Sequence, residues 1–318
     1  MTPPQMTQLQ MTPPPNHAGE PVATPPVFRF APSPNGPLHL GHALSALTGY
    51  EMARAMGGRF LLRIEDIDKA RTRDAHVQAI YRDLAWLGLT WEQPVWRQSA
   101  RFDVYRAATA RLTAQGLLYP CFATRSEIAA AIAQSHPSDP DGAPLFPSAL
   151  KRIASAMTAT RIARGEPHAL RIDMARAVAA ANAKLLGAPL TFTEIAPDGA
   201  RETRAAHPER WGDAILVRKD TPTSYHLAVV VDDSAQGITH VTRGQDLLAS
   251  TDIHRLLQAL LGLPEPLYRH HPLILDPDGR KLSKTDGDLG ISALRDAGLT
   301  PAEVRARIAA PPPGGMPN

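Results

Sequence analysis

Short apolar segments alternate with longer amphipathic segments along most of this 318-residue chain, and this alternation restricts the fold more than any other feature. Val27–Ala31 and Arg59–Ile64 have the length and apolar content of buried strands. Between them, leucines recur at helical spacing from His39 until Gly57-Gly58 ends the pattern. Strands that alternate with helices predict an α/β fold with a parallel sheet.

The same alternation continues to residue 261 around an Ala/Arg-rich middle segment. Further helices are expected over residues 77–87, 102–112 and 251–261, and further strands over Ile215–Arg218, Leu227–Val231 and Ile238–Thr242. The middle segment is expected to be a subdomain inserted between two halves of the sheet. We therefore predict a sheet domain in two parts, an insertion, a loop with a small helical C-terminal part, and two Pro-rich disordered tails: 27–119 with 208–262, 120–207, 263–310, and 1–26 with 311–318.

Composition excludes several classes of protein. Thirty-four basic and 31 acidic residues give a net charge of +3, which permits a nucleic-acid partner without requiring one. Cys121 is the single cysteine, so a disulfide framework and a thiolate-only zinc site are both excluded. The N-terminal residues have no basic and apolar signal pattern, and no apolar run approaches the roughly 20 residues of a membrane span. We expect a cytoplasmic protein.

The first candidate motif, P-S-P-N-G-P-L-H-L-G-H-A, runs from Pro32 to Ala43 between the first strand and the first helix. Backbone N–H groups and the helix dipole at such a turn favour an anion such as phosphate. His39 and His42 are three residues apart, so both belong to the first helical turn, where imidazoles can donate hydrogen bonds to phosphate oxygens. The alternatives are a capped helix with two exposed histidines, or a metal-binding pair, for which the second turn offers no further ligand.

The second candidate motif is K-L-S-K-T, which follows P-D-G-R and precedes D-G-D. Lys281 and Lys284 in a Gly-rich loop suit a clamp on a triphosphate, because ammonium groups stabilise charge that moves toward pyrophosphate. Taken alone, such a motif is more often a solvated basic loop. The nearby His270-His271 pair is expected to pack near this loop rather than bind a metal.

Together, the two motifs resemble the HIGH and KMSKS signatures of the class I aminoacyl-tRNA synthetases, at His39–His42 and Lys281–Thr285. The resemblance narrows to the catalytic core of glutamyl-tRNA synthetases through R-F-A-P-S-P-N-G-P-L-H-L-G-H, R-I-E-D-I-D from Arg63, Y-H-L-A-V-V-V-D-D from Tyr225 and T-R-G-Q-D-L-L from Thr242. The chain resembles most closely their shortened bacterial paralogues, the glutamyl-Q tRNA(Asp) synthetases. The similarity covers about 27–262 and the KLSKT region and is weak through 125–205.

The resemblance implies a Rossmann-type catalytic sheet, an insertion that binds the acceptor and C-terminal helices that contact the tRNA stem. It also implies ATP with Mg²⁺ as substrate, held by His39, Gly41, His42 and Lys284, with His39, His42, Lys281 and Lys284 as catalytic residues. Glutamate would be bound by Arg29, Phe30, Ala31, Pro32, Ser33, Glu65, Tyr225 and Arg243. These residues suit glutamate, because its two carboxylates can pair with the guanidinium groups of Arg29 and Arg243 and its ammonium group with Glu65. A surface ion pair of Glu65 with Arg63 or Lys69, and a merely structural Tyr225, are the alternatives.

The end of the chain decides between subfamilies. Residues 286–318 follow the KLSKT motif, and a separate anticodon-binding domain needs on the order of 100 residues. The short paralogues attach glutamate to queuosine, the wobble base of tRNA(Asp), so we expect the anticodon stem-loop to enter the site of a monomeric enzyme. A truncated glutamyl-tRNA synthetase acting on the 3′ end of tRNA(Glu), and a non-catalytic tRNA-binding module, are the alternatives.

The zinc ligands common among those paralogues are mostly missing. Y-P-C-F-A-T-R keeps Cys121 but has Ala123 at the next ligand position, and Phe146 and Leu150 stand at the expected downstream positions. One soft ligand cannot close a tetrahedral zinc site. We therefore predict no structural zinc and expect Cys121 to be a small buried apolar residue.

Overall fold

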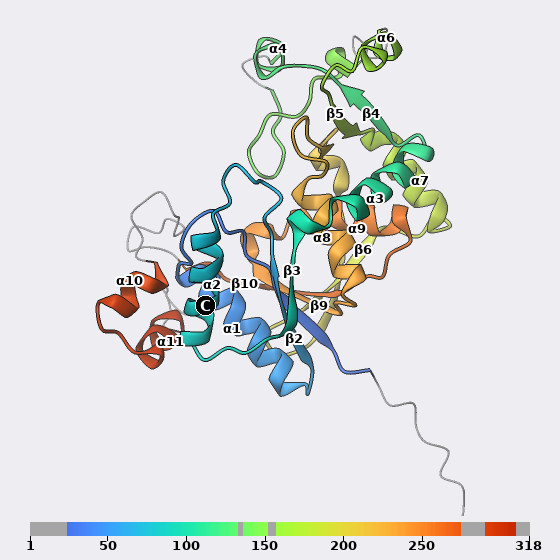
Figure 1. The fold of residues 1–318 in the computed structure, drawn as a ribbon. Coiled ribbons are helices and arrows are strands. Elements are labelled where there is room, and N and C mark those ends of the chain that lie inside the picture. The colour runs from blue at the N-terminus through green and yellow to red at the C-terminus, as the bar shows by residue number, and fades with distance from the viewer. Residues whose placement is uncertain (1–23, 133–135, 152–156, 275–289, 310–318) are drawn as a thin grey trace, which may run out of the picture.

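The computed structural model describes residues 24–132, 136–151, 157–274 and 290–309. Its centre is a seven-stranded sheet in the order β3-β2-β1-β9-β10-β6-β7, in which every neighbouring pair is parallel except the β6–β7 hairpin (Figure 1). This confirms the expected α/β fold. The strands of the sheet are β1 (Val27–Phe30), β2 (Arg59–Ile64), β3 (Glu92–Arg97), β6 (Thr191–Ile195), β7 (Arg201–Ala205), β9 (His240–Gly244) and β10 (Leu267–His271).

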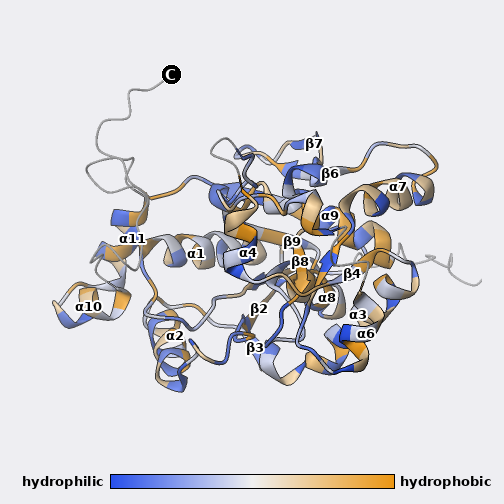
Figure 2. Ribbon diagram, turned by 90° about the horizontal axis from the view of Figure 1, so that it is seen from above, coloured by the Kyte–Doolittle hydropathy of each residue, from blue (hydrophilic) through white to orange (hydrophobic). Residues whose placement is uncertain are grey.

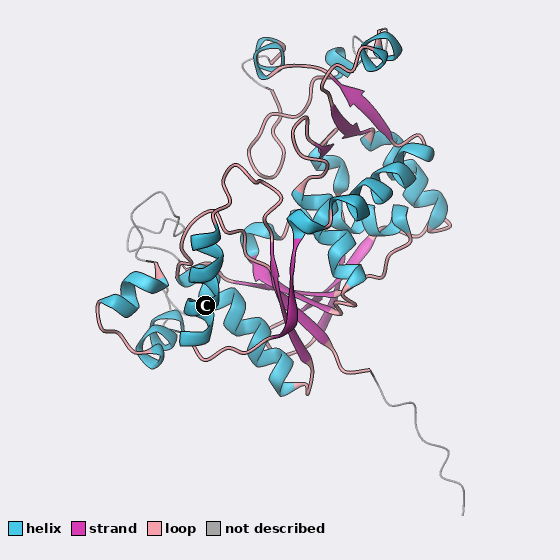
Figure 3. Ribbon diagram, viewed as in Figure 1, coloured by secondary structure: helices cyan, strands magenta, loops and turns pink. Residues whose placement is uncertain are grey.

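Helices cover both faces of this sheet (Figure 3). The larger ones are α1 (Leu40–Ala55), α2 (Asp74–Trp86), α3 (Phe102–Ala114), α7 (Met174–Lys184), α8 (Tyr225–Ala235) and α9 (Ser250–Leu261). The strand β1 shows how the faces are assigned. Phe28 and Phe30 pack into the core that includes α1 and α2, whereas Val27 packs into the core that includes α3, α7, α8 and α9. Arg29, between the phenylalanines, therefore points to the α8 side, as residue alternation in a strand requires.

The strand predicted over Leu227–Val231 is wrong, because these residues lie in the helix α8. All of Leu227–Asp233 is buried, and α8 packs against α3, α9 and the small strand β8 (Ile215–Val217). Figure 2 shows strongly hydrophobic ribbon at β8 and α8 in the middle of the molecule. A short apolar run that is buried on all sides has no period that distinguishes a helix from a strand. The next predicted strand is confirmed, but β9 begins two residues later than expected.

The segment expected as one insertion, 120–207, contributes to two sheets. A small antiparallel sheet has the order β4-β5-β8. The first part of the segment supplies the end of β4 (Leu118–Cys121) and all of β5 (Ala169–Ile172). Its last part forms β6 and β7, which extend the main sheet beyond β10. The strand predicted over Ile215–Arg218 is confirmed as β8, one residue shorter, but it belongs to the small sheet. The short helices α4 (Arg125–Ala130) and α6 (Thr158–Ala163) lie near that sheet (Figure 1).

The C-terminal part returns to the first half of the sheet domain. The helices α10 (Ile291–Asp296) and α11 (Pro301–Ala309) pack beside α1 and α2, where Arg295 forms an ion pair with Asp83 at 2.9 Å and Arg305 one with Glu51 at 2.9 Å. Single-turn helices complete the described elements at η1 (Gln98–Ala100), η2 (Pro208–Trp211) and η3 (Gln245–Leu247). None of the helices in the described ranges combines the length and apolarity needed to cross a bilayer.

Candidate active site

A cavity of about 400 Å³ lies at the carboxyl ends of β1, β2, β9 and β10. The sheet order reverses there, because β1 has β2 on one side and β9 on the other. Open α/β sheets bind ligands at such a switch point. The cavity is lined by every predicted glutamate or ATP residue in the described ranges: Arg29, Phe30, Ala31, Pro32, Ser33, His39, Gly41, His42, Glu65, Tyr225 and Arg243. Lys281 and Lys284 lie outside the described residues.

His39 and His42 cap the N-terminus of α1 with their side chains. The Gly41 N–H donates to Nδ1 of His39 at 3.1 Å, and the His39 N–H donates to Nδ1 of His42 at 3.2 Å. A neutral imidazole that accepts at Nδ1 carries its proton on Nε2. The capping part of the alternative is therefore confirmed, but both rings line the cavity and are half-buried rather than exposed. Donation to a phosphate stays a prediction. A β-carbon on Gly41 would lie 3.0 Å from Cε1 of His39, so any larger residue would make a tight contact with this ring.

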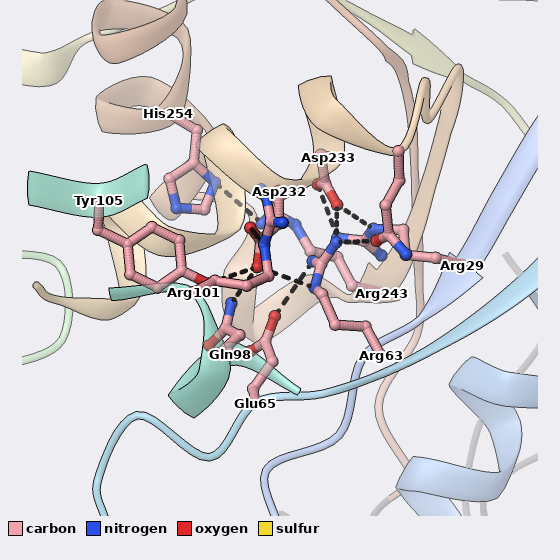
Figure 4. A network of polar contacts seen from close by, with 11 residues as sticks. Arg29, Arg63, Glu65, Gln98, Arg101, Tyr105, Asp232, Asp233, Arg243 and His254 are labelled. Atoms are coloured by element: carbon pink, nitrogen blue, oxygen red, sulfur yellow. Dashed lines mark hydrogen bonds and ion pairs between the residues drawn. The ribbon is translucent and has the colours of Figure 1, made fainter. Parts of the chain in front are cut away.

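Arg29 and Glu65 are held by two buried residues behind the cavity (Figure 4). Arg29 donates from Nε and Nη2 to the two carboxylate oxygens of Asp233, at 3.0 and 3.2 Å. Arg63 donates to Asp233 at 2.8 Å and to Glu65 at 3.2 Å. Glu65 therefore does pair with Arg63, but the pair is buried rather than on the surface, with side-chain exposures of 6% and 0%.

Burial and charge act on these carboxylates in opposite directions. Burial raises the pKa of Glu65, although Arg63 and Arg29 oppose this shift. Burial also acts to raise the pKa of Asp233, but Arg29 and Arg63 outweigh it and hold that pKa below its ordinary value. Asp233 is thus a fixed anion between two guanidinium groups.

Arg243 has a different environment. Its Nε donates to Nε2 of His270 at 3.0 Å, its Nη1 to Nδ1 of His254 at 3.2 Å, and its Nη2 to the Thr251 hydroxyl at 2.7 Å. Because a guanidinium can only donate, each of these partners must present a lone pair. Burial, followed by the charge of Arg243, lowers the pKa of His254 well below its ordinary value. Arg243 is therefore surrounded by neutral acceptors.

Tyr225 begins α8 and reaches the cavity beside Arg243. Its ring lies 5.5 Å from that of His254, centroid to centroid, in an edge-to-face arrangement. Burial raises the pKa of its hydroxyl, so the side chain is a neutral donor at neutral pH. This position fits the predicted contact with a ligand, and the contact itself stays a prediction.

Sequence reasoning gave no place in the cavity to several residues at or after the ends of β9 and β10. His271 shares a hydrogen bond of 2.7 Å with the Ser45 hydroxyl, and Asp246 and Leu273 also line the cavity. The rule that places ligands beyond the carboxyl ends of parallel strands would have pointed to these positions. Of the expected His270-His271 pair, His271 faces the cavity while His270 lies behind Arg243.

The predicted remnant of a zinc site lies in the small sheet. Cys121 is a free, buried residue at the end of β4. At the downstream positions, the Phe146 ring lies 4.0 Å below the guanidinium carbon of Arg171, in a cation–π contact. Within the described ranges no group of three or more His, Cys, Asp or Glu side chains could hold a metal ion.

Known proteins with similar sequences are tRNA synthetases and tRNA ligases. The family described as tRNA synthetases class I (E and Q), catalytic domain, matches residues 27–309. A glutamyl-Q tRNA(Asp) synthetase of Rhodobacter capsulatus is 46% identical over 289 residues, which are 89% of this chain and 99% of the relative. One of Symbiobacterium thermophilum is 40% identical over 88% of this chain and 84% of the relative.

Solved structures with a similar fold are also aminoacyl-tRNA synthetases. A glutamate tRNA ligase of Elizabethkingia meningosepticum, crystallised with its amino acid, superimposes with a TM-score of 0.63 at 30% identity. The match covers 83% of this chain and 53% of that larger one. A Mycobacterium tuberculosis methionyl-tRNA synthetase, at 14% identity and a TM-score of 0.54, shares the fold. The chain therefore belongs to the class I tRNA synthetases (E and Q), in the family of the proteins named glutamyl-Q tRNA(Asp) synthetase.

Proposed function

We propose that this protein activates L-glutamate with ATP-Mg²⁺ in the absence of tRNA, forming glutamyl-adenylate, and then transfers glutamate to the queuosine base at the wobble position of tRNA(Asp). The observation that carries the proposal is the distribution of charge around one cavity. Two histidine donors sit at a helix N-terminus, and Arg243, which has neutral partners, lies near the carboxylate of Glu65. The histidines at the helix N-terminus suit a phosphate group, and Arg243 together with Glu65 suits an amino acid with two carboxylates.

In the first step an oxygen of the glutamate α-carboxylate attacks the α-phosphorus of ATP, and pyrophosphate leaves. His39 and His42 donate from Nε2 to oxygens of the α-phosphate as negative charge builds there. Lys281 and Lys284, assigned from the sequence, neutralise the charge that passes to pyrophosphate. Mg²⁺ arrives with ATP and screens its phosphates. Positioning and electrostatics supply the acceleration, and no covalent enzyme intermediate is needed.

Glutamate is oriented by charge. Arg243 binds a carboxylate of glutamate, because its partners among the described residues are uncharged and none of them neutralises its guanidinium group. Glu65 accepts from the ammonium group, and Tyr225 donates from its hydroxyl. Arg29 keeps N–H groups beyond those given to Asp233, and the backbone from Phe30 to Ser33 forms the adjoining wall.

In the second step a hydroxyl of the cyclopentenediol of queuosine attacks the carbonyl carbon of the adenylate, loses its proton, and AMP leaves. The names of the relatives from Rhodobacter capsulatus and Symbiobacterium thermophilum support this acceptor. The anticodon stem-loop would enter the cavity, with the segment 120–207 and the C-terminal helices beside the tRNA. We propose that the protein acts as a monomer in the cytoplasm and holds no structural zinc.

Pyrophosphate exchange without tRNA tests the first step, and we expect it to depend on glutamate. Transfer of labelled glutamate to tRNA(Asp) with and without queuosine tests the second, and only the modified tRNA should be labelled. Absence of exchange contradicts activation, whereas equal labelling of both tRNAs contradicts the acceptor.

A second candidate is favoured by one observation, since a glutamate–tRNA ligase of Aquifex aeolicus is 36% identical over 86% of this chain. This chain spans 54% of that relative. A protein of that type would charge the 3′ end of tRNA(Glu). Removal of the terminal adenosine separates the two, because glutamate on queuosine survives it and glutamate on the 3′ end does not.

A further inference from the structure

Five neighbouring strands each contribute one arginine, histidine or glutamate side chain to the α8/α9 face of the main sheet. In sheet order they are Arg63, Arg29, Arg243, His270 and Glu194. The last comes from β6, which lies in the segment 120–207 that was expected as an insertion. It does not line the cavity, and the proposed function assigns it nothing.

Glu194 binds His270 through both of its carboxylate oxygens. The His270 backbone N–H donates to Oε1 at 2.8 Å, and the ring Nδ1 lies 2.7 Å from Oε2. Both residues are buried, with side-chain exposures of 7% and 2%. A carboxylate can only accept here, so the ring must carry its proton on Nδ1.

The other ring nitrogen of His270 completes a chain of contacts. Nε2 accepts from Nε of Arg243 at 3.0 Å, and Arg243 can only donate. The ring must therefore be neutral and protonated on Nδ1 to satisfy Glu194 and Arg243 at once. Burial lowers the pKa of His270 and agrees with that state, although Glu194 acts in the opposite direction.

The contacts of Arg29 and Arg243 differ in kind. Arg29 uses two N–H groups on a carboxylate, whereas the three partners of Arg243 are all uncharged. Within the described ranges no Asp or Glu oxygen lies in ion-pair distance of Arg243. An arginine whose direction is fixed by neutral acceptors keeps its charge for a ligand and loses little conformational entropy on binding.

We infer that Glu194 is a positioning residue for amino-acid recognition, which acts by holding His270 in the tautomer that anchors Arg243 for a ligand carboxylate. The inference rests on the proposed binding of glutamate at Arg243. It adds that a residue on β6, outside the cavity, sets the affinity for the amino acid without affecting ATP.

The test compares Glu194→Gln with Glu202→Gln. The amide of the first variant offers one acceptor where His270 needs two, so either the backbone N–H or the ring loses its partner, and the ring can turn a proton toward Arg243. Glu202 is the register partner of Glu194 on β7, but it is exposed and serves as the matched control. In pyrophosphate exchange we expect E194Q to raise KM for glutamate about tenfold and to leave KM for ATP within twofold of wild type, while E202Q matches wild type.

A second variant keeps the test decisive if E194Q does not fold. His270→Asn can still donate from its amide nitrogen toward Glu194, but its shorter side chain has no acceptor at the position of Nε2, where Arg243 donates. It should raise KM for glutamate by a similar factor. The double variant should be no worse than either single one, because both changes act through Arg243.

The outcomes separate the two proposals. No glutamate-dependent exchange by wild type overturns the proposed function and this inference with it. Wild-type exchange together with an unchanged KM for glutamate in E194Q, or in H270N where E194Q is unfolded, overturns the inference alone. So does an equal rise of both KM values, which indicates a general structural defect.

Discussion

Asp233 on α8 binds Arg29 on β1 through both carboxylate oxygens, across 204 positions of sequence, and the two side chains are 9% and 5% exposed. The same carboxylate accepts from Arg63 on β2. One buried anion thus fixes two guanidinium groups from neighbouring strands, which places Arg29 at the cavity and leaves Arg63 to hold Glu65.

Asp233→Asn keeps the shape of the side chain and removes its charge. Breaking a buried ion pair from one side costs about 3–5 kcal/mol, because the remaining charges are left uncompensated. We expect the free energy of unfolding in urea to fall by about that amount. Asp103→Asn is the control, since Asp103 pairs with Arg106 while 98% exposed and should change stability by less than about 1 kcal/mol. Equal effects of the two variants would contradict the role given to Asp233.

The titration of His226 should contribute to the pH dependence of stability, because burial lowers the pKa of this residue to about 4. Its Nδ1 lies 3.2 Å from Nε2 of His254, and the charge of Arg243 acts in the same direction as burial. In the unfolded chain the histidine binds a proton near pH 6.5, whereas in the folded protein it does so only near pH 4. Stability is therefore fully present above about pH 6.5 and lost as pH falls toward about 4, by at most about 1.4 kcal/mol per pH unit.

The measurement compares wild type with His226→Gln, which still offers an acceptor to His254 and does not titrate. As the pH falls from about 6.5 to about 4, the unfolding free energy of wild type should decrease more than that of His226→Gln. A difference that stays constant across this range would show that His226 is not held neutral in the fold.

Gly41→Ala should impair catalysis without unfolding the protein. The added β-carbon would lie 3.0–3.1 Å from the His39 ring, so the ring would have to move by a few tenths of an ångström from its capping position. Alanine favours a helix over glycine by up to about 1 kcal/mol, so the unfolding free energy should not fall. We expect kcat of exchange to drop at least about tenfold with KM for glutamate little changed. An unaltered kcat would mean that the ring geometry does not matter to the phosphate step.

Metal removal should have no lasting effect. Dialysis against a strong chelator, followed by return of Mg²⁺, should leave both the unfolding temperature and the exchange activity as they were, because Cys121 has no partner set for zinc in the described ranges. Elemental analysis should find zinc well below one atom per chain. A stoichiometric zinc signal, or a lowered unfolding temperature after chelation, would refute the prediction.

Local patterns predicted much of the first half of the fold. The strands at Val27 and Arg59 and the helix between them appear as expected, because strict spacing and glycine stops specify one element each. The site residues were assigned from motifs, and the fold brings all the described ones to one cavity. The apolar run at Leu227 was misassigned because burial on all sides erases the period.

Residue types and short-range spacing were enough to predict the class of fold, the motifs and the chemistry that their side chains can perform. Three contacts required the folded arrangement: Asp233 neutralises Arg29, Arg243 donates to neutral histidines, and Glu194 on β6 binds His270 from behind. Those contacts depend on strand order and on which face of each strand is covered. That order is set by the joint burial of the whole sheet, and no local spacing encodes it.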